Sequence, residues 1–198
     1  MSSGWGGRCH VQCVAGDRVL NPRVLEEIPG ADGATATVSE INDLRDWQAR
    51  LQDLQVRYTA AIDNDQLEAW PEFFTEDCHY RITTKADFDE ALPLGIIYAT
   101  SRAMLRDRVT SLREANIYED QGYRHVINPP LITESTKEGL RSETNFMVVR
   151  TRHDGDMLLF AAGRYLDLVV FNGTTPQFAE KTVVVDSNKI DTLLAIPL

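Results

Sequence analysis

A short aromatic stretch, WPEFFTEDCHYRIT at residues 70–83, mixes side chains that can transfer protons with side chains that build cores. General acid–base chemistry needs a His, a carboxylate or a Tyr held in an apolar pocket. Neighbours in a strand point to opposite faces, so only one of His79 and Tyr80 can face an enclosed interior. No spacing singles out one residue among the candidates, which are His79, Asp77, Asp63, Tyr80 and His125.

The aromatic residues of this stretch are explained more simply as packing where a helix meets a strand. We therefore predict a core formed there by Trp70, Phe73, Phe74, Cys78 and Tyr80.

Other kinds of chemistry have weaker support. The N-terminal CHVQC places Cys9, His10 and Cys13 close together, but its spacing is neither CxxC nor CxxCH and no second ligand pair follows. Two unpaired thiols are the simpler interpretation. The sequence also lacks the glycine-rich loops that bind nucleotide phosphates and the GxSxG elbow of hydrolases.

Arginines crowd the segment TSRAMLRDRVTSLRE at residues 100–114. Arg102 and Arg106 are four residues apart and project from one helix face, which is typical of a solvated surface. The alternative is that Arg106, Arg108 or Arg113 pairs with carboxylates on another subunit, since the planar guanidinium suits such pairs.

Two further features suggest buried or shared contacts. His125 follows Arg124, whose positive charge would discourage protonation of the imidazole, so we expect a core or interface contact there. The final residues IDTLLAIPL are too apolar for a free end. They fit a segment buried in a groove or against a neighbouring chain, and a final edge strand is the competing interpretation.

The periodicity predicts which elements position these residues. Apolar residues at three- and four-residue steps predict a long helix over 39–62, a second short helix over 65–76 bent by Pro71, and a third over 100–114 with Met104, Leu105, Val109 and Leu112 on one side. Residues 78–83 resemble a strand, and 83–95 a loop. Four strand-like runs follow: YRHVINPPLIT, SETNFMVVRTRH, DMLLFAAGRYLDLVVF and PQFAEKTVVVD.

Tight turns at Asp154-Gly155 and Asn172-Gly173 connect the last three runs. Helices followed by a strand meander predict an α+β fold in which a curved antiparallel sheet packs on the helices. We expect residues 1–38 to be an arm that is weakly ordered unless a partner holds it, and 39–198 to be one domain.

Charge and composition narrow the partners. The 198 residues carry a net charge of −10, which disfavours nucleic acid and anionic membranes, and we expect neither partner. No apolar run is long enough to span a bilayer, and the N-terminus does not resemble a signal peptide. Three cysteines cannot all pair within one chain, which favours a reducing cytoplasm.

Taken together, WPEFFTEDCHYRI, DRVTSLREANIYE, the following YRH, NFMVVRTRHDG and IDTLLAIPL resemble the small (β) subunits of bacterial aromatic-ring-hydroxylating dioxygenases. The sequence looks most like the subunits that serve aromatic carboxylates, as in terephthalate dioxygenase and salicylate 5-hydroxylase. The resemblance covers roughly residues 44–198. The arm departs from the family pattern, and is either a real extension or a translation start placed too far upstream.

The resemblance implies a cone-shaped α+β fold like that of nuclear transport factor 2. It also implies three catalytic α and three β chains, with the Rieske [2Fe-2S] cluster and the mononuclear iron on α and electrons arriving from a reductase or ferredoxin. The residues agree, because no second Cys-His pair accompanies Cys78-His79 and the other histidines are scattered. We thus expect no catalytic, cofactor-binding or metal-binding residue on this chain.

We expect subunit contacts at Arg106, Arg108, Arg113, Arg124, His125, Ile196 and Leu198. The rival hypothesis is a self-sufficient cone-fold isomerase or dehydratase that uses cavity residues near Tyr80, which would require an open apolar pocket. The sequence does not indicate which aromatic substrate is used or whether the β chain adjusts specificity.

Overall fold

The structure is a computed structural model in which long antiparallel strands dominate. It describes residues 38–93, 95–114, 121–188, 194 and 196–198. The side chains of 38–44 lie outside this description. The predicted arm, with Cys9, His10 and Cys13, also lies outside the described residues, so the predicted two-part organisation stays a prediction.

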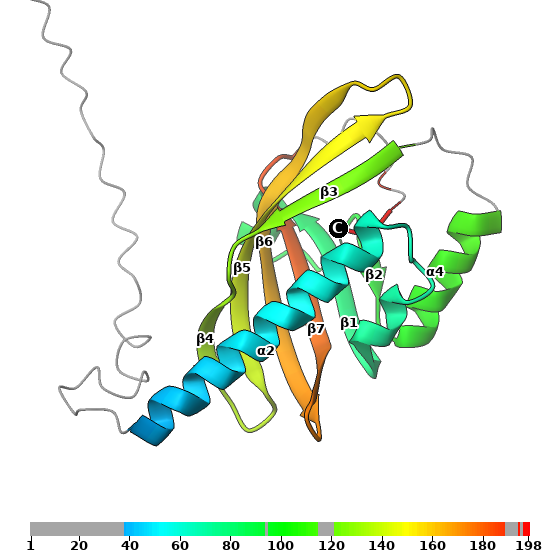
Figure 1. Ribbon diagram of the computed structural model, residues 1–198. Helices are drawn as coiled ribbons and strands as arrows, with labels where there is room; N and C mark the ends of the chain where they lie inside the picture. Colours follow the sequence, from blue (N-terminus) through cyan, green and yellow to red (C-terminus); the bar gives the residue numbers. More distant parts are fainter. Residues whose placement is uncertain (1–37, 94, 115–120, 189–193, 195) are drawn as a thin grey trace, which may run out of the picture. The chain divides into compact units, whose positions relative to one another are not determined.

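One long helix, α2 (Val38–Asp63), lies across the sheet (Figure 1). Its inward face carries Leu51, Leu54, Tyr58 and Ile62, which are all at most 4% exposed. The predicted periodicity is therefore confirmed over this part of the helix. Trp47, nearer its start, is partly exposed and packs edge-on against Phe171 with ring centroids 4.5 Å apart.

The predicted second helix over 65–76 is wrong. Asp65 has a positive φ of 56°, and only a four-residue 3-10 turn, η1 (Trp70–Phe73), forms before the chain extends into β1 (Phe74–Thr84). Pro71 occupies the start of that turn, and the aromatic and β-branched residues after it favour a strand. The strand is thus longer at its beginning than the sequence indicated.

The predicted loop over 83–95 contains one short helix, and a short strand follows it. The helix α3 (Lys85–Asp89) begins where the Thr84 hydroxyl accepts a hydrogen bond from the Asp87 N–H, and β2 (Ile97–Ala99) then pairs with β1. The predicted third helix is confirmed as α4 (Arg102–Glu114). It buries Leu105, Val109 and Leu112, whereas Met104 is 43% exposed, contrary to the prediction.

The strand meander is confirmed with one division. The run YRHVINPPLIT forms two strands, β3 (Gln121–Ile127) and β4 (Leu131–Ser135), because its two prolines cannot donate to a sheet. Next come β5 (Leu140–Arg152), β6 (Met157–Asn172) and β7 (Thr175–Val185). Both predicted turns are present, with Gly155 at φ 88° and Gly173 at φ 62°.

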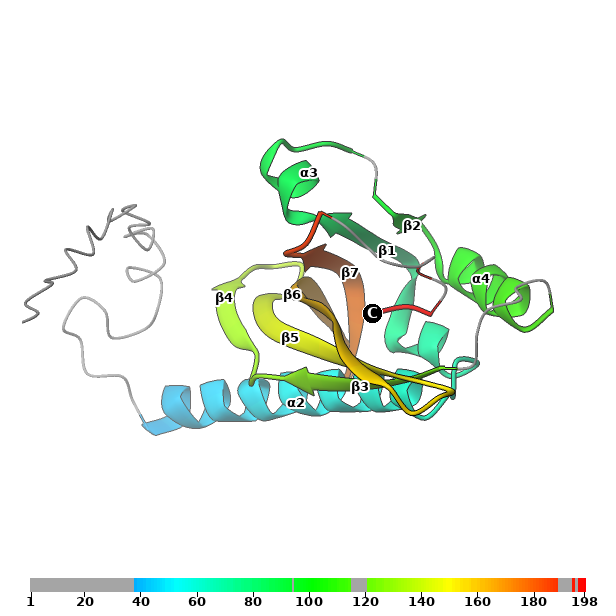
Figure 2. The same ribbon diagram turned by 90° about the horizontal axis from the view of Figure 1, so that it is seen from above.

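The described strands form one sheet in the order β2-β1-β7-β6-β5-β3, with β4 also paired to β5. The pairs are antiparallel except β1 and β7, which are parallel and bring the first long strand beside the last. The predicted antiparallel sheet is therefore mixed at this point. Seen from above, the strands curve around the end of the chain marked C (Figure 2).

Candidate functional site

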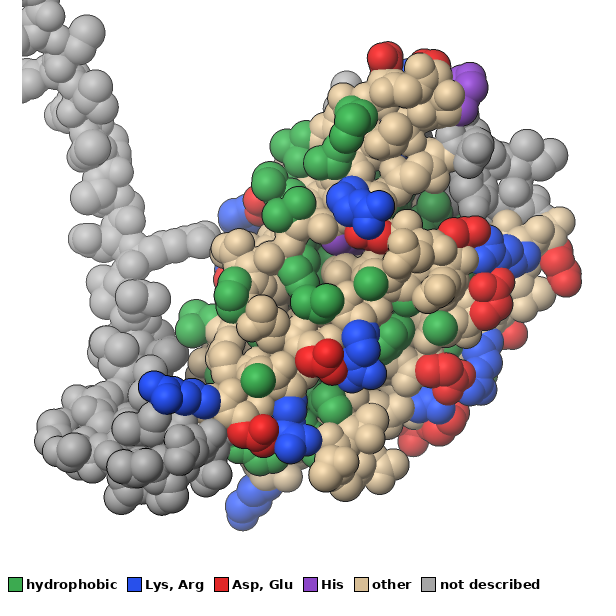
Figure 3. All heavy atoms as spheres, in the orientation of Figure 1, with side chains coloured by type: hydrophobic (Ala, Val, Ile, Leu, Met, Phe, Trp, Pro, Cys, Tyr) green, Lys and Arg blue, Asp and Glu red, His purple; other side chains and the backbone are tan. Residues whose placement is uncertain are grey.

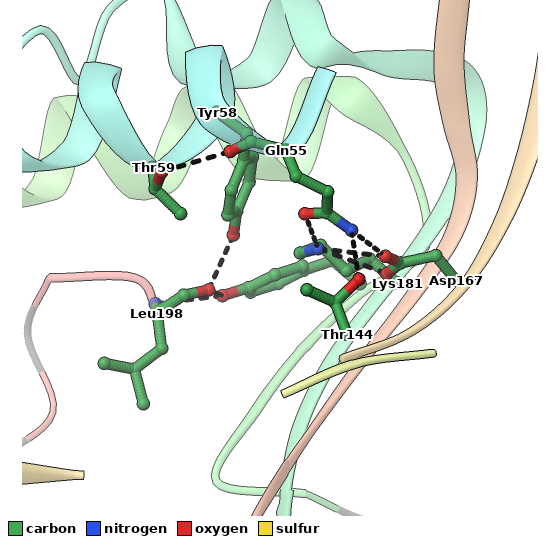
Figure 4. A network of polar contacts seen from close by, with 8 residues as sticks. Gln55, Tyr58, Thr59, Thr144, Asp167, Lys181 and Leu198 are labelled. Atoms are coloured by element: carbon green, nitrogen blue, oxygen red, sulfur yellow. Dashed lines mark hydrogen bonds and ion pairs between the residues drawn. The ribbon is translucent and has the colours of Figure 1, made fainter. Parts of the chain in front are cut away.

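The interior of the curved sheet contains the chain's own last residues. Leu198 is fully buried, and its backbone oxygen accepts hydrogen bonds from two tyrosine hydroxyls. Tyr58 on α2 donates at 2.6 Å and Tyr80 on β1 at 3.1 Å. Figure 4 shows the Tyr58 hydroxyl pointing at this residue. Helix and strand thus hold one oxygen between them.

We define the tail as the described residues 194 and 196–198, and all of them are buried. Leu194 and Ile196 are 4% and 7% exposed, and the Leu194 carbonyl oxygen accepts a hydrogen bond of 2.9 Å from Arg108 Nη2. Of the two interpretations of IDTLLAIPL, burial in a groove is confirmed for the described residues, and they form no edge strand. Burial lowers the pKa of the Arg108 guanidinium from its usual value.

Aromatic rings surround the buried tyrosines. Trp70 contacts Tyr80 edge-on with centroids 5.2 Å apart, and Tyr58 contacts Phe178 edge-on at 5.5 Å. Burial raises the pKa of Tyr58 and that of Tyr80 well above the usual value for tyrosine, so both hydroxyls stay protonated and can donate hydrogen bonds. The packing interpretation of residues 70–83 is confirmed, since Trp70, Phe74, Cys78 and Tyr80 are fully buried and Phe73 packs against them.

A buried ion pair, not predicted from the sequence, lies deeper in the core. Lys181 and Asp167 face each other on β7 and β6, and Lys181 Nζ is 3.1 Å and 3.3 Å from the two carboxylate oxygens. Gln55 of α2 accepts from the same ammonium at 3.1 Å and donates to Asp167 (Figure 4). Both charged side chains are 0% exposed.

Three aromatic rings complete the environment of Lys181. Its Nζ is 3.8 Å from the ring centroid of Tyr165, 4.3 Å from that of Phe178 and 4.5 Å from that of Tyr58. Burial lowers the pKa of Lys181 to about 8, although the neighbouring carboxylate opposes this shift. Burial also raises the pKa of Asp167. Because both side chains are fully covered, we assign this pair to the core.

Two of the acid–base candidates meet. The backbone N–H of His125 donates to Asp63 Oδ2 at 2.9 Å, and the ring nitrogen Nδ1 of His125 lies 2.6 Å from Asp63 Oδ1. A carboxylate only accepts, so the imidazole Nδ1–H donates in this contact. The polar contact expected for His125 is present within the chain, where its side chain is 0% exposed. Its role at a subunit interface stays a prediction. Arg124 lies 3.9 Å from Asp63 Oδ2 and is 68% exposed.

The remaining candidates do not join a site. Asp77 and His79 are exposed, whereas Tyr80 points inward, as strand alternation requires. Neither of two hollows among the described residues, with volumes of about 200 and 150 Å³, is lined by Tyr80. Burial raises the pKa of the Cys78 thiol to about 11, which makes it a poor nucleophile.

The arginines of α4 find partners within the chain. Arg106 Nη2 lies 2.8 Å from Glu72 Oε1, and Arg113 contacts both Asp65 and Glu68 at 2.7–3.1 Å. Arg102 Nε donates to the Phe74 carbonyl oxygen at 2.8 Å. These contacts do not test whether Arg106, Arg108 or Arg113 also reaches a neighbouring subunit, so that remains a prediction.

Metal ligands do not gather in the described part of the chain. Within it, no three His, Cys, Asp or Glu side chains are close enough together to hold an ion. The described residues therefore do not fit a Rieske cluster or a non-haem iron site, each of which needs several such ligands.

None of the described helices is long and apolar enough to cross a membrane.

Helices on a curved mixed sheet, with an interior lined by side chains from α2, β1 and β7, define the α+β fold of nuclear transport factor 2. The structure of the benzoate 1,2-dioxygenase β subunit from Burkholderia mallei shares this fold, with a TM-score of 0.57 at 18% identity over 77% of this chain and 93% of that one. The predicted fold class is confirmed.

Three closer comparisons define the family. A family model described as "Ring hydroxylating beta subunit" matches residues 42–192. The anthranilate 1,2-dioxygenase small subunit of Burkholderia cepacia is 43% identical over 79% of this chain and 96% of its own length. The terephthalate 1,2-dioxygenase subunit beta 2 of a Comamonas species is 44% identical over 71% and 92%.

A crystal structure from Novosphingobium aromaticivorans, described as the β subunit of an aromatic-ring-hydroxylating dioxygenase, is also similar. It has a TM-score of 0.72 at 34% identity and covers 78% of this chain and 99% of that one. The chain belongs to the family of ring-hydroxylating dioxygenase β subunits. It is therefore one subunit of a dioxygenase complex, and its partner is the large α subunit.

Proposed function

We propose that this chain is the non-catalytic, structural β subunit of a Rieske non-haem iron oxygenase that hydroxylates an aromatic carboxylate in aromatic catabolism in the cytoplasm. The observation that carries the proposal is the occupied interior, where the tail lies on the two tyrosines that would line an active site of this fold. The relatives named for anthranilate and terephthalate support an aromatic carboxylate as the substrate.

The α subunit then holds both metal centres, and a reductase or ferredoxin delivers electrons through it. The lack of grouped ligands in the described residues is consistent with this division of labour. The β chain has a structural role in this proposal. In a complex of three α and three β chains, it holds the α subunits at the spacing that lets one chain's cluster reduce its neighbour's iron.

The outer face of the sheet offers a surface for these contacts. Val126 pairs with Met147 on adjacent strands, and Arg124 pairs with Val149. We define the outer strip as the exposed apolar residues Val126, Met147, Met157 and Leu159, which are 44–69% exposed. Figure 3 shows apolar side chains gathered along the β5–β6 hairpin. Such patches are typical of interfaces, and arginine is enriched beside them.

Of the residues expected at subunit contacts, Arg124 is the most accessible, because it is 68% exposed and its only described ion pair is the 3.9 Å contact with Asp63. Leu198 and the His125 side chain are fully covered by their own chain, so an interface role for them would be indirect. We therefore propose that Arg124 and the outer strip contact a neighbouring subunit.

Co-expression with the α subunit tests both the structural role of this chain and the proposed contact at Arg124. The wild-type complex should have the mass of three chains of each kind, with an iron–sulfur absorption band only when α is present. Arg124→Glu should weaken assembly, whereas Arg57→Glu, a charge reversal at a 53% exposed site on α2, should not. Native mass spectrometry that finds both variants fully assembled would remove Arg124 from the interface. A stable β chain that never binds α would refute the function.

A further inference from the structure

A second exposed apolar surface lies at the end of the sheet away from the outer strip. Strand β2 is the edge of the described sheet on this side. Ile97 and Ala99 of this strand are buried, so Tyr98 between them points outward. We define the edge patch as four apolar residues that are 42–49% exposed, namely Leu92, Ile96, Tyr98 and Met104.

Contacts within the chain hold the edge patch together. Arg81 of β1 lies opposite Tyr98 in the sheet, and its Nη1 donates to the Leu92 carbonyl oxygen at 3.2 Å. Just after β2, the Thr100 backbone N–H and hydroxyl both donate to Met104 Sδ at 3.4 Å. The edge patch is therefore one surface that follows β2, and not a set of scattered side chains.

The outer strip and the edge patch contain most of the large exposed apolar side chains in the described part of the chain. The others there are Trp47, Val56 and Leu131. The strip lies on β3, β5 and β6, whereas the patch follows β2 at the opposite end of the strand order. Figure 2 shows β2 and β3 on different sides of the curved sheet. Grouped exposed apolar residues are typical of contact surfaces.

The two surfaces are flanked by opposite charges. Arg124, which is 68% exposed, lies beside the outer strip. Two exposed carboxylates flank the edge patch: Glu90 precedes Leu92 by two residues, and Asp77 lies on β1, the strand that pairs with β2. Such complementarity favours a contact between the two surfaces over a contact of either surface with itself.

Symmetry also calls for two surfaces. In a closed ring of three identical chains, each contact joins one surface of a chain to a different surface of the next chain. We propose that the edge patch binds the outer strip of a second copy of this chain, and that three such contacts close a ring of β chains. This inference rests on the proposed function, from which the number of three β chains is taken.

Cross-linking within the complex of α and β chains tests the contact. Cys9 and Cys13 are first replaced by Ser, and Cys78 is kept because it is fully buried. Tyr98→Cys then places a thiol in the edge patch, and Met147→Cys places one in the outer strip, both at exposed positions. A short bis-maleimide joins thiols that face each other across a contact, and a denaturing gel separates the products by mass.

We expect chains with both new cysteines to give linked products of two and three β chains. Chains with only one of them should give none, whereas complexes assembled from a mixture of the two single variants should give linked pairs. Leu131→Cys combined with Met147→Cys is the matched control, because Leu131 is 65% exposed and belongs to neither surface. Its yield of linked β chains should be at least about tenfold lower.

The other results overturn the proposal. Linked pairs from one single variant alone would show a contact between identical surfaces. A product that joins β to α would assign that surface to the α subunit, and equal yield from the control would show that the linking is not specific. A complete complex without linked β chains would end the inference and leave the proposed function standing. A β chain that never binds α would refute both, and this is seen before any cross-linker is added.

Discussion

Replacing Lys181 with methionine removes one half of the buried ion pair and keeps a side chain of similar length. The change deletes the contacts of 3.1 Å and 3.3 Å to Asp167 and the 3.1 Å contact to Gln55. It leaves the Asp167 carboxylate, which is 0% exposed, with the Gln55 amide as its remaining strong hydrogen-bond donor. Breaking a buried pair in this way typically costs about 3–5 kcal/mol, because the other charge stays uncompensated.

Urea unfolding at pH 7, below the folded-state pKa of Lys181, measures this loss. Lys137→Met, at an exposed position, is the control and should change the free energy of unfolding by less than about 0.5 kcal/mol. The double variant Lys181→Met/Asp167→Leu should recover most of the loss, since two apolar side chains leave no stranded charge. If Lys181→Met costs less than about 1 kcal/mol, or if the double variant is as unstable as the sum of both single variants, the reasoning is wrong.

The same pair predicts a pH dependence. The folded-state pKa of Lys181, about 8, lies below its unfolded value, so above pH 8 the unfolded chain binds more protons than the folded chain. Stability from this group therefore rises with pH, by at most about 1.4 kcal/mol per pH unit, and is lost as pH falls back through 8. The difference between wild type and Lys181→Met, measured from pH 7.5 to 9.5, should show this slope. A flat difference would contradict it.

Three other substitutions give separate checks by urea or thermal unfolding. Leu198→Ala should cost about 2–5 kcal/mol, because the side chain is fully buried, whereas Leu131→Ala should cost under about 0.5 kcal/mol; equal effects would refute the tail's packing role. Asp63→Asn should cost about 1.5–3 kcal/mol by weakening both contacts to His125, and an unchanged midpoint would contradict that geometry. Arg113→Ala should cost only about 0.5–1 kcal/mol and less in 1 M salt, because its partners are exposed; a salt-independent loss would count against this.

The fold could be predicted from the sequence where one kind of signal dominated. The three- and four-residue steps of α2 and the paired turns at Gly155 and Gly173 identified long elements correctly. The second helix failed because helical spacing in Leu67, Trp70 and Phe74 competed with Pro71 and with a strand that begins earlier. Apolar spacing alone cannot distinguish these outcomes over so few residues.

The buried polar contacts were harder to predict. Lys181 and Asp167 lie at inward-facing positions of strands whose neighbours at two-residue steps are buried, including Tyr165, Val169 and Val183. Opposite charges at such positions were a usable signal that we did not use. Their cross-strand alignment depends on the pairing register of β6 and β7, and the contact of His125 with Asp63 depends on how α2 packs on β3. Both are set by tertiary structure.

The most direct test of the central claim is an iron and turnover measurement on the purified β chain, with and without its α partner. The account predicts that the isolated chain contains no stoichiometric iron and does not hydroxylate an aromatic carboxylate. Activity and an iron–sulfur absorption band should appear only when α is added. Tightly bound iron in the isolated chain, or hydroxylation by it alone, would contradict the account.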